Sequence, residues 1–161
     1  KRVAQAYQEL TRYSWDKDSV NKHFVFFKSD SDNQLVVVSN IFYSSLCEHH
    51  LLPYFGHISI GYIPDSRVLG LSKFKRIVDA VTKQLSVQEE LSQEIFDLLM
   101  DKIKPQGLIL KMEGKHTCSL IRGAKDEHSV FSVIKYSDHF LEHPEKIDHF
   151  FRMIQKGERG L

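Results

Sequence analysis

Residue types that bind transition metals gather at two places in the sequence. Cys47, His49 and His50 lie within four consecutive positions. The other cysteine of the chain, Cys118, follows His116 after one threonine. Thiolate sulfur and neutral imidazole nitrogen suit zinc, and a catalytic zinc has three such protein ligands and one position open to water. Cys47, His50 and Cys118 would supply those three ligands, which leaves the other two histidines near the metal and free for proton transfer.

The backbone must turn for this site to form. Residues three apart on a regular strand face opposite sides, so Cys47 and His50 can hold one ion only where the strand ends. An alternative interpretation remains open at this point. Two cysteines in a chain are often reduced, buried apolar side chains, and neighbouring histidines are often surface or capping residues.

Composition narrows the class of protein. A chain of 161 residues favours a single domain over residues 1–161, and its 42% apolar and 27% charged residues are ordinary for a globular protein. A net charge of +1 does not indicate binding to nucleic acid or to a membrane surface. The sequence has no signal peptide and no apolar run of membrane-spanning length, so we expect a cytoplasmic, reducing setting without disulfides. Because it opens directly in a helical pattern, we also expect that a preceding N-terminal segment is missing.

The first third of the chain predicts one helix, a loop and two strands. Apolar residues at helical spacing predict a short amphipathic helix over residues 2–12, and residues 13–33 are polar and read as a loop. The β-branched run 35–46 predicts a strand that leads into Cys47. Alternation of Ile58, Ile60 and Tyr62 with small residues predicts a second strand that is buried on one face.

The segment after residue 71 predicts a helix with a basic first turn. Ser72 is the expected N-cap. The apolar stripe of this helix comprises Phe74, Ile77, Val78, Val81 and Leu85. Lys73, Lys75 and Arg76 have the wrong sign for the positive end of the helix dipole, so Ser72, Lys73 and Arg76 are interpreted as a phosphate site. A solvated basic face would explain the same charges.

The remaining elements are two helices and two strands. A helix is predicted over 87–103, and Ser86-x-x-Glu89 matches a capping box, which would explain Glu89 without a functional role. Strands are predicted over 108–112 and 129–136, and the last helix begins at Pro144. It is expected to bury Ile147, Phe150, Phe151 and Ile154. The order of elements predicts an antiparallel α+β sheet covered on one face, whose two free edges favour oligomerisation.

Several blocks of the sequence resemble the GTP cyclohydrolase I family. The blocks are SSLCEHHLLPYFGHISIGYIPD (44–65), VLGLSKFKRIVDA (68–80), LSVQEELSQEI (85–95) and KHTCSLIRG (115–123), after an opening KRVAQAY. Together they cover nearly the whole chain in the family's order. The resemblance implies the tunnelling fold (T-fold), in which ββααββ sheets with N- and C-terminal helices form oligomeric barrels. It further implies a homodecamer with active sites shared between subunits.

The resemblance also implies an activity. Family members convert GTP and water to 7,8-dihydroneopterin triphosphate and formate, the first step of folate and tetrahydrobiopterin synthesis. Some are allosteric enzymes with a regulatory protein, for which this sequence offers no sign. The implied zinc ligands are Cys47, His50 and Cys118; the implied catalytic residues are His49, His116 and Ser72. The implied substrate contacts are Glu89 and Gln88 for guanine, and Lys73, Arg76, Arg122 and Arg2 for the triphosphate, with Arg2 from a neighbouring subunit.

The sequence departs from the family pattern in three features. Gln5 stands where the family often has a lysine, Glu90 replaces a usual arginine, and the fourth strand lacks the usual threonines.

Two other functions remain open for this sequence. A 7-cyano-7-deazaguanine reductase on the same fold would need a free nucleophilic cysteine. A non-catalytic, zinc-stabilised GTP-binding or regulatory subunit would not need His49 and His116.

Overall fold

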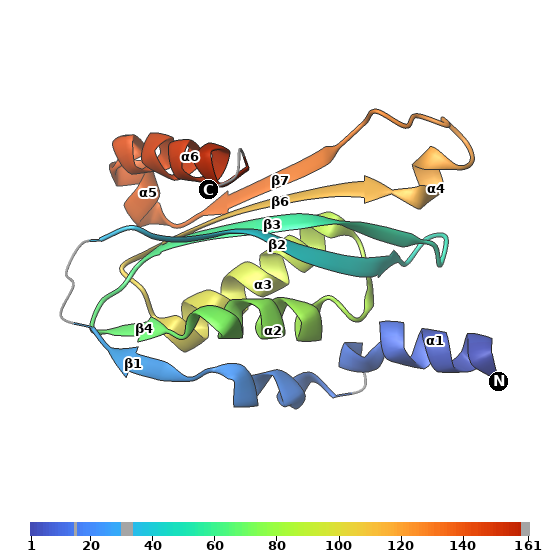
Figure 1. The fold of residues 1–161 in the computed structure, drawn as a ribbon, viewed down its shortest axis with the longest axis horizontal. Coiled ribbons are helices and arrows are strands. Elements are labelled where there is room, and N and C mark those ends of the chain that lie inside the picture. The colour runs from blue at the N-terminus through green and yellow to red at the C-terminus, as the bar shows by residue number, and fades with distance from the viewer. Residues whose placement is uncertain (15, 30–33, 159–161) are drawn as a thin grey trace.

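The computed structural model describes residues 1–14, 16–29 and 34–158, and it contains a central five-stranded sheet with helices on both sides (Figure 1). The strand order is β5-β2-β3-β6-β7, antiparallel except that β5 runs parallel to β2. The strands are β2 (Val36–Cys47), β3 (Pro53–Ile63), β5 (Leu85–Ser86), β6 (Gly107–His116) and β7 (Phe131–Tyr136). The four predicted strands and their antiparallel pairing are therefore confirmed, and β5 is an additional short strand at one edge.

Helices pack on both faces of the sheet. The α2 (Leu71–Val81) and α3 (Gln88–Ile103) helices lie against one face, as expected from their apolar stripes. The α6 helix (Pro144–Glu158) lies on the opposite face at one end and buries Phe150 and Ile154. Ile147 and Phe151 are only partly buried against the same cluster. The prediction of one covered face was wrong because α6 folds back over the sheet.

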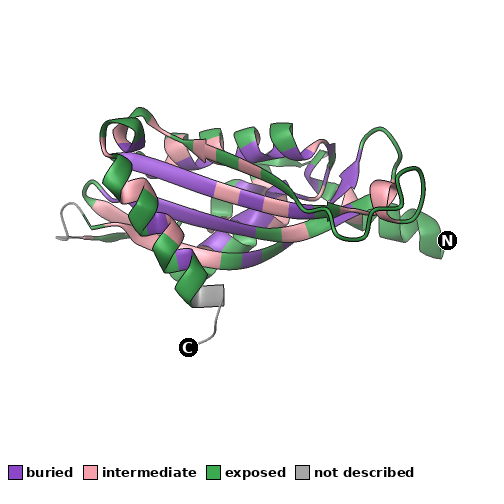
Figure 2. Cartoon of the chain, turned by 90° about the horizontal axis from the view of Figure 1, so that it is seen from above, coloured by how far each residue is buried: buried purple, intermediate pink, exposed green. Residues whose placement is uncertain are grey.

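Strand β3 shows the consequence of this double cover. Every residue from Ile58 to Ile63 is buried, and not only the alternate ones that the sequence predicts (Figure 2). A Cβ atom added at Gly61 would lie 2.7 Å from the ring of Phe150, so the glycine lets that ring rest on the strand. Small residues between the apolar ones thus make room for a second layer.

Two helix starts differ from the predicted ones. The N-cap of α2 is Gly70, so Ser72 lies inside the helix, and Leu85 belongs to β5. The N-cap of α3 is Val87, which makes no side-chain capping bond. The hydroxyl of Ser86 donates to the carbonyl oxygen of Val87 instead. The predicted capping box is therefore wrong, and Glu89 has no capping role.

The N-terminal region contains more structure than predicted. Helix α1 (Arg2–Leu10) is confirmed, but none of its residues is buried. The predicted loop instead holds two 3₁₀ segments and a strand that pairs with β4, while residues 30–33 of its polar end lie outside the described residues. These elements are η1 (Arg12–Ser14), η2 (Lys17–His23), β1 (Phe26–Lys28) and β4 (Arg67–Leu69). The two remaining short helices are α4 (Thr117–Leu120) and α5 (Asp138–Glu142). Among the described residues, no helix combines the length and apolar character that a membrane span needs.

Candidate metal and catalytic site

The hairpin between β2 and β3 brings Cys47 and His50 together. Cys47 ends β2, and the next three residues form a turn. Leu51 has a φ of 54° and donates its backbone N–H to the carbonyl oxygen of Cys47 at 2.9 Å. This left-handed residue folds the chain back, so that the Cys47 sulfur lies 3.5 Å from Nδ1 of His50. The turn that a shared ion requires is present.

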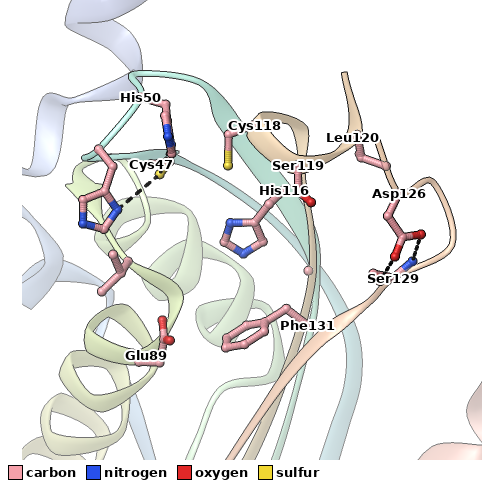
Figure 3. Close-up of a pocket in the computed structure, with 13 residues that line it drawn as sticks. Cys47, His50, Glu89, His116, Cys118, Ser119, Leu120, Asp126, Ser129 and Phe131 are labelled. Atoms are coloured by element: carbon pink, nitrogen blue, oxygen red, sulfur yellow. Dashed lines mark hydrogen bonds between the residues drawn. The ribbon is translucent and has the colours of Figure 1, made fainter. Parts of the chain in front are cut away.

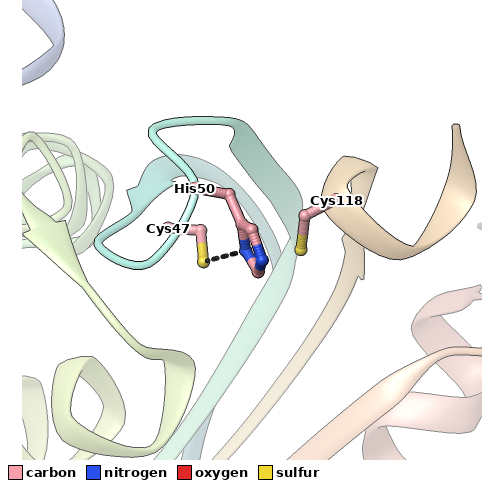
Figure 4. A group of neighbouring side chains, drawn as sticks. All are labelled: Cys47, His50 and Cys118. Atoms are coloured by element: carbon pink, nitrogen blue, oxygen red, sulfur yellow. Dashed lines mark hydrogen bonds between the residues drawn. The ribbon is translucent and has the colours of Figure 1, made fainter. Parts of the chain in front are cut away.

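Cys118 joins this pair from a neighbouring strand end. It lies on α4, directly after β6, and β6 pairs with β3 so that His116 faces Tyr54 beside the hairpin. The ligand atoms of Cys47, His50 and Cys118 all lie within 4.8 Å of one another (Figure 4). Among the described residues, they form the one group of three such side chains close enough to share an ion.

The chemistry of the three donors fits a zinc ion. Burial and the neighbouring Cys47 thiol raise the pKa of Cys118, while the guanidinium of Arg122 opposes that shift. Two thiols placed together in a partly buried site are hard to ionise without a compensating charge. A divalent cation supplies that charge and deprotonates its thiol ligands, so the donor set suits a soft-ligand metal such as zinc.

A pocket of about 380 Å³ opens over these residues. Its walls come from the hairpin, α4, the start of α3 and the loop before β7 (Figure 3). It is lined by Cys47, His49, His50, Val87, Glu89, Gly114, His116, Cys118, Ser119, Leu120, Asp126, Ser129 and Phe131. The predicted metal ligands, both predicted proton carriers and Glu89 thus share one cavity.

The ring of His116 is held on three sides. It stacks on Tyr54 with ring centres 4.6 Å apart and meets Phe131 edge-on at 5.8 Å. Its Nε2 lies 3.0 Å from Oε1 of Gln88. Burial lowers the pKa of His116, and the nearby Glu89 carboxylate opposes that shift. The histidine therefore lies in a partly desolvated site with a fixed ring plane.

Gln88 lies behind His116 and does not line the pocket. Its side chain is fully buried, and its amide nitrogen donates to the carbonyl oxygens of Met112 and Phe131 at 3.1 and 3.0 Å. The expected contact with guanine would require breaking these bonds. Glu89, the next residue, is exposed and faces the cavity.

The α2 helix, which carries the predicted phosphate residues, begins at the other end of the sheet. Leu69, just before α2, donates its backbone N–H to the hydroxyl of Tyr62. Tyr62 is eight positions along β3 from Tyr54, which corresponds to roughly 26 Å at the rise of a strand. None of Ser72, Lys73 and Arg76 lines the pocket of its own chain.

Two predicted arginines also lie outside the pocket wall. Arg2 is exposed on α1, and Arg122 is exposed just after α4, four residues from Cys118. Arg122 is close enough to the metal ligands to affect the pKa of Cys118, whereas Arg2 has no such link.

The loop before β7 contributes residues that the sequence analysis missed. Asp126 accepts hydrogen bonds from the backbone N–H groups of His128 and Ser129 and from the Ser129 hydroxyl, and these bonds lower the pKa of Asp126. An aspartate followed three residues later by serine is a known turn signal. It predicts an ordered loop, but not the cavity that the loop faces.

The family model and the curated relatives that match this chain point to one family. A model of the GTP cyclohydrolase I family matches residues 1–155. The GTP cyclohydrolase 1 of Chlorobium phaeovibrioides is 37% identical over 96% of this chain and 69% of its own, and that of Campylobacter lari is 34% identical over 98% and 83%. An archaeosine synthase QueF-Like structure has a TM-score of 0.53 at 18% identity, covering 66% of this chain and 96% of its own. That last likeness concerns the fold alone.

Proposed function

The chain belongs to the GTP cyclohydrolase I family, and from this premise we propose that it is a zinc-dependent hydrolase that converts GTP and water to 7,8-dihydroneopterin triphosphate and formate. The tunnelling fold expected from the sequence agrees with the family match and the structural neighbour. The reaction would be the first step of pterin and tetrahydrofolate synthesis, carried out in the cytoplasm by one catalytic domain over residues 1–161.

One observation carries the zinc proposal. The ligand atoms of Cys47, His50 and Cys118 lie within 4.8 Å of one another at the wall of a cavity that also contains Glu89 and His116. When bound there, zinc supplies Lewis-acid activation of water in its open position. The same three residues without a pocket would favour a structural role; the pocket favours a catalytic one.

The histidines of the pocket suit the proton transfers. Opening the imidazole ring of guanine at C8 and releasing formate require protons to be delivered to ring nitrogens and removed from water. His116 and His49 line the cavity, and imidazole is the side chain best able to exchange protons near neutral pH. Ser72 is proposed to assist the later sugar rearrangement.

Guanine and triphosphate would be held by different regions. Glu89 presents a carboxylate that can accept the N1 and N2 hydrogens of guanine, which adenine cannot match. Lys73, Arg76, Arg122 and Arg2 are proposed to bind the triphosphate. Because α2 begins far from the pocket of its own chain, a second copy would supply Lys73 and Arg76. An oligomer with shared sites is therefore proposed, and its size, a homodecamer, is what the resemblance to the family implies. No nucleic-acid or membrane partner is proposed.

The alternatives predict other features at the same place. A nitrile reductase needs a cysteine free to attack its substrate, but both cysteines lie in the three-residue cluster. A non-catalytic GTP-binding subunit does not need two histidines facing the cavity. These observations favour the hydrolase.

The test is product formation from GTP by the purified protein. Formate and the pterin product should appear together, should disappear after chelation, and should return when zinc is added back. Zinc measured on the same sample should approach one ion per chain, and ATP should give no product. Zinc-free protein with full activity would contradict the metal assignment, and zinc-loaded protein that binds GTP without product would favour the binding subunit.

A further inference from the structure

The orientation of the Gln88 amide follows from its two carbonyl neighbours. Carbonyl oxygens only accept hydrogen bonds, so the groups near Met112 and Phe131 must be the amide N–H donors. The amide oxygen is then the atom that faces His116, at 3.0 Å from Nε2. The reverse orientation would place the amide oxygen against two carbonyl oxygens and leave both of those contacts without a proton.

This orientation sets the tautomer of His116. An amide oxygen has no proton to give, so Nε2 of His116 must carry one and donate it. In a neutral ring, Nδ1 is then the unprotonated nitrogen. In the part of the chain that the structure describes, Nδ1 has no hydrogen-bond partner, while the ring lines the pocket. Exchange of a proton with a bound molecule is thereby restricted to Nδ1.

The surrounding packing keeps this arrangement in place. The Tyr54 ring lies parallel to the imidazole at 4°, and the Phe131 ring contacts it edge-on at 81°, so two rings constrain the imidazole plane independently of Gln88. A Cβ atom added at Gly114 would lie 2.5 Å from Oε1 of Gln88. The glycine therefore provides the space in which the amide oxygen reaches Nε2.

We propose that Gln88 is a positioning residue that fixes the tautomer of His116, with the proton on Nε2 and Nδ1 left to serve the reaction, rather than a contact for guanine. The inference deepens the proposed function and rests on it for the catalytic role of His116. Gln88 acts only through the histidine, because it is fully buried and all of its polar atoms are engaged within the protein.

The kinetics of a Gln88 variant distinguish a role in positioning His116 from a direct contact with guanine. Methionine has a similar length and cannot make these hydrogen bonds. In zinc-loaded Gln88→Met we expect kcat to fall about 10- to 100-fold, the range found when a metal-binding histidine loses the partner that orients it. The KM for GTP should stay within about twofold. A guanine contact predicts the opposite, a raised KM with kcat retained, and that result would overturn the proposal.

Gln84 provides a matched control for the loss of a buried amide. It is also buried, and its amide nitrogen donates to the carbonyl oxygen of Val81 and to Glu94 at 2.9 and 2.7 Å. Gln84→Met should lower the melting temperature by a similar amount to Gln88→Met and leave kcat within about twofold of the wild type. An equal fall of kcat in both variants would mean that Gln88 acts through stability alone.

A spectroscopic measurement tests the tautomer without relying on turnover. In zinc-loaded protein labelled with ¹⁵N-histidine, His116 should show a protonated Nε2 and an unprotonated Nδ1, and the signal should change in Gln88→Met but not in Gln84→Met. A His116→Ala sample identifies the signal. A proton on Nδ1 in the wild type would overturn the proposal. Because this result does not require formate production, it stays informative if the hydrolase assignment fails.

Discussion

The pocket end of the sheet and the N-terminal end of α2 differ in one respect. A single chain assembles the proposed metal site at the first, but at the second it supplies proposed phosphate-binding residues that do not line its own pocket. At the pocket end, Cys47, His50 and Cys118 are already close enough to share an ion, and His116 is held by an aromatic stack and a buried amide. At the α2 end, the residue just before the helix, Leu69, contacts Tyr62, which lies roughly 26 Å along β3 from Tyr54 at the pocket, and neither Lys73 nor Arg76 lines that pocket.

The difference follows from the precision that each task requires. Metal ligands must lie within about 0.2 Å of their ideal distances, which neighbouring strand ends of one chain can achieve. Lysine and arginine are long and flexible, and their charges act over several ångströms. Phosphate contacts can therefore be supplied across an interface between copies, whereas the metal site cannot easily be divided.

Exposed apolar surface supports such an interface. Val3 on α1 is 71% exposed, and Ile134 and Tyr136 on the edge strand β7 are 42% and 44% exposed. An apolar edge strand favours pairing with another chain. Oligomerisation is implied by the family, and these surfaces are its expected location.

Removing one metal ligand should have the largest effect. Cys118→Ala leaves two donors, so zinc should be lost and formate production should fall by more than about 100-fold, since even outer partners of metal ligands are worth 10- to 100-fold. Metal analysis and a formate assay check this. The control is His57→Ala, which replaces an exposed histidine of β3 that contacts Phe42 on β2, and this variant should retain zinc. Zinc retained in Cys118→Ala would break the assignment.

Removing the α2 cations should weaken substrate use and leave the metal in place. In Lys73→Ala/Arg76→Ala, kcat/KM for GTP should fall about 100-fold or more, because each charge-assisted bond contributes about 1.5–3 kcal/mol. Lys75 lies between them but pairs with Asp79 and donates to the Phe42 carbonyl oxygen. Lys75→Ala should therefore change kcat/KM less than about threefold. An equal loss of kcat/KM in Lys75→Ala and in the double variant would mean that α2 contributes only a general basic face and no specific phosphate site.

Replacing Glu89 distinguishes a role in guanine recognition from a role in the stability of the fold. Glu89→Gln should raise the KM for GTP by about tenfold through loss of the acceptor pair. Its melting temperature should stay near that of the wild type, because Val87 is the N-cap and no capping box is formed. Glu90→Gln is the neighbouring exposed control. A drop in melting temperature with an unchanged KM would restore the structural explanation.

The smallest expected effect comes from adding a charge. Gln5 lies on α1, which has no buried residue, at a position where the family often has lysine. Gln5→Lys should lower the KM for GTP about two- to fivefold, the size of an exposed charge contact. An unchanged KM in titrations at low salt would exclude this end of α1 from the triphosphate site.

Sequence patterns predicted what depends on local periodicity. The four main strands and the long helices α1, α2, α3 and α6 follow from alternation and apolar stripes. The metal-ligand candidates follow from the C-x-x-H spacing and the one other cysteine, Cys118. The capping box failed because Ser86 is drawn into β5, where it pairs with Cys47, so α3 starts one residue later than such a cap requires. A long-range strand contact thus overrode a local signal.

Other features depend on tertiary packing and have no local pattern. The second covered face arises from Phe150 resting on Gly61, residues far apart in sequence. Pairing of β1 with β4 likewise joins distant segments. The position of Gln88 behind His116 could not be read from its place beside Glu89, because adjacent helical residues point in different directions.

Complementation between two inactive variants tests most directly the claim that two copies complete one site. Cys118→Ala lacks the metal half, and Lys73→Ala/Arg76→Ala lacks the phosphate half; each should be nearly inactive alone. The two variants are co-expressed with different tags, and oligomers that contain both are purified. Some sites in these oligomers combine the intact metal ligands of one variant with the intact α2 cations of the other. If mixing is random, such sites should restore on the order of a quarter of wild-type formate production. Mixed oligomers with no recovered activity would contradict the account, because each pocket would then rely on the α2 cations of its own chain.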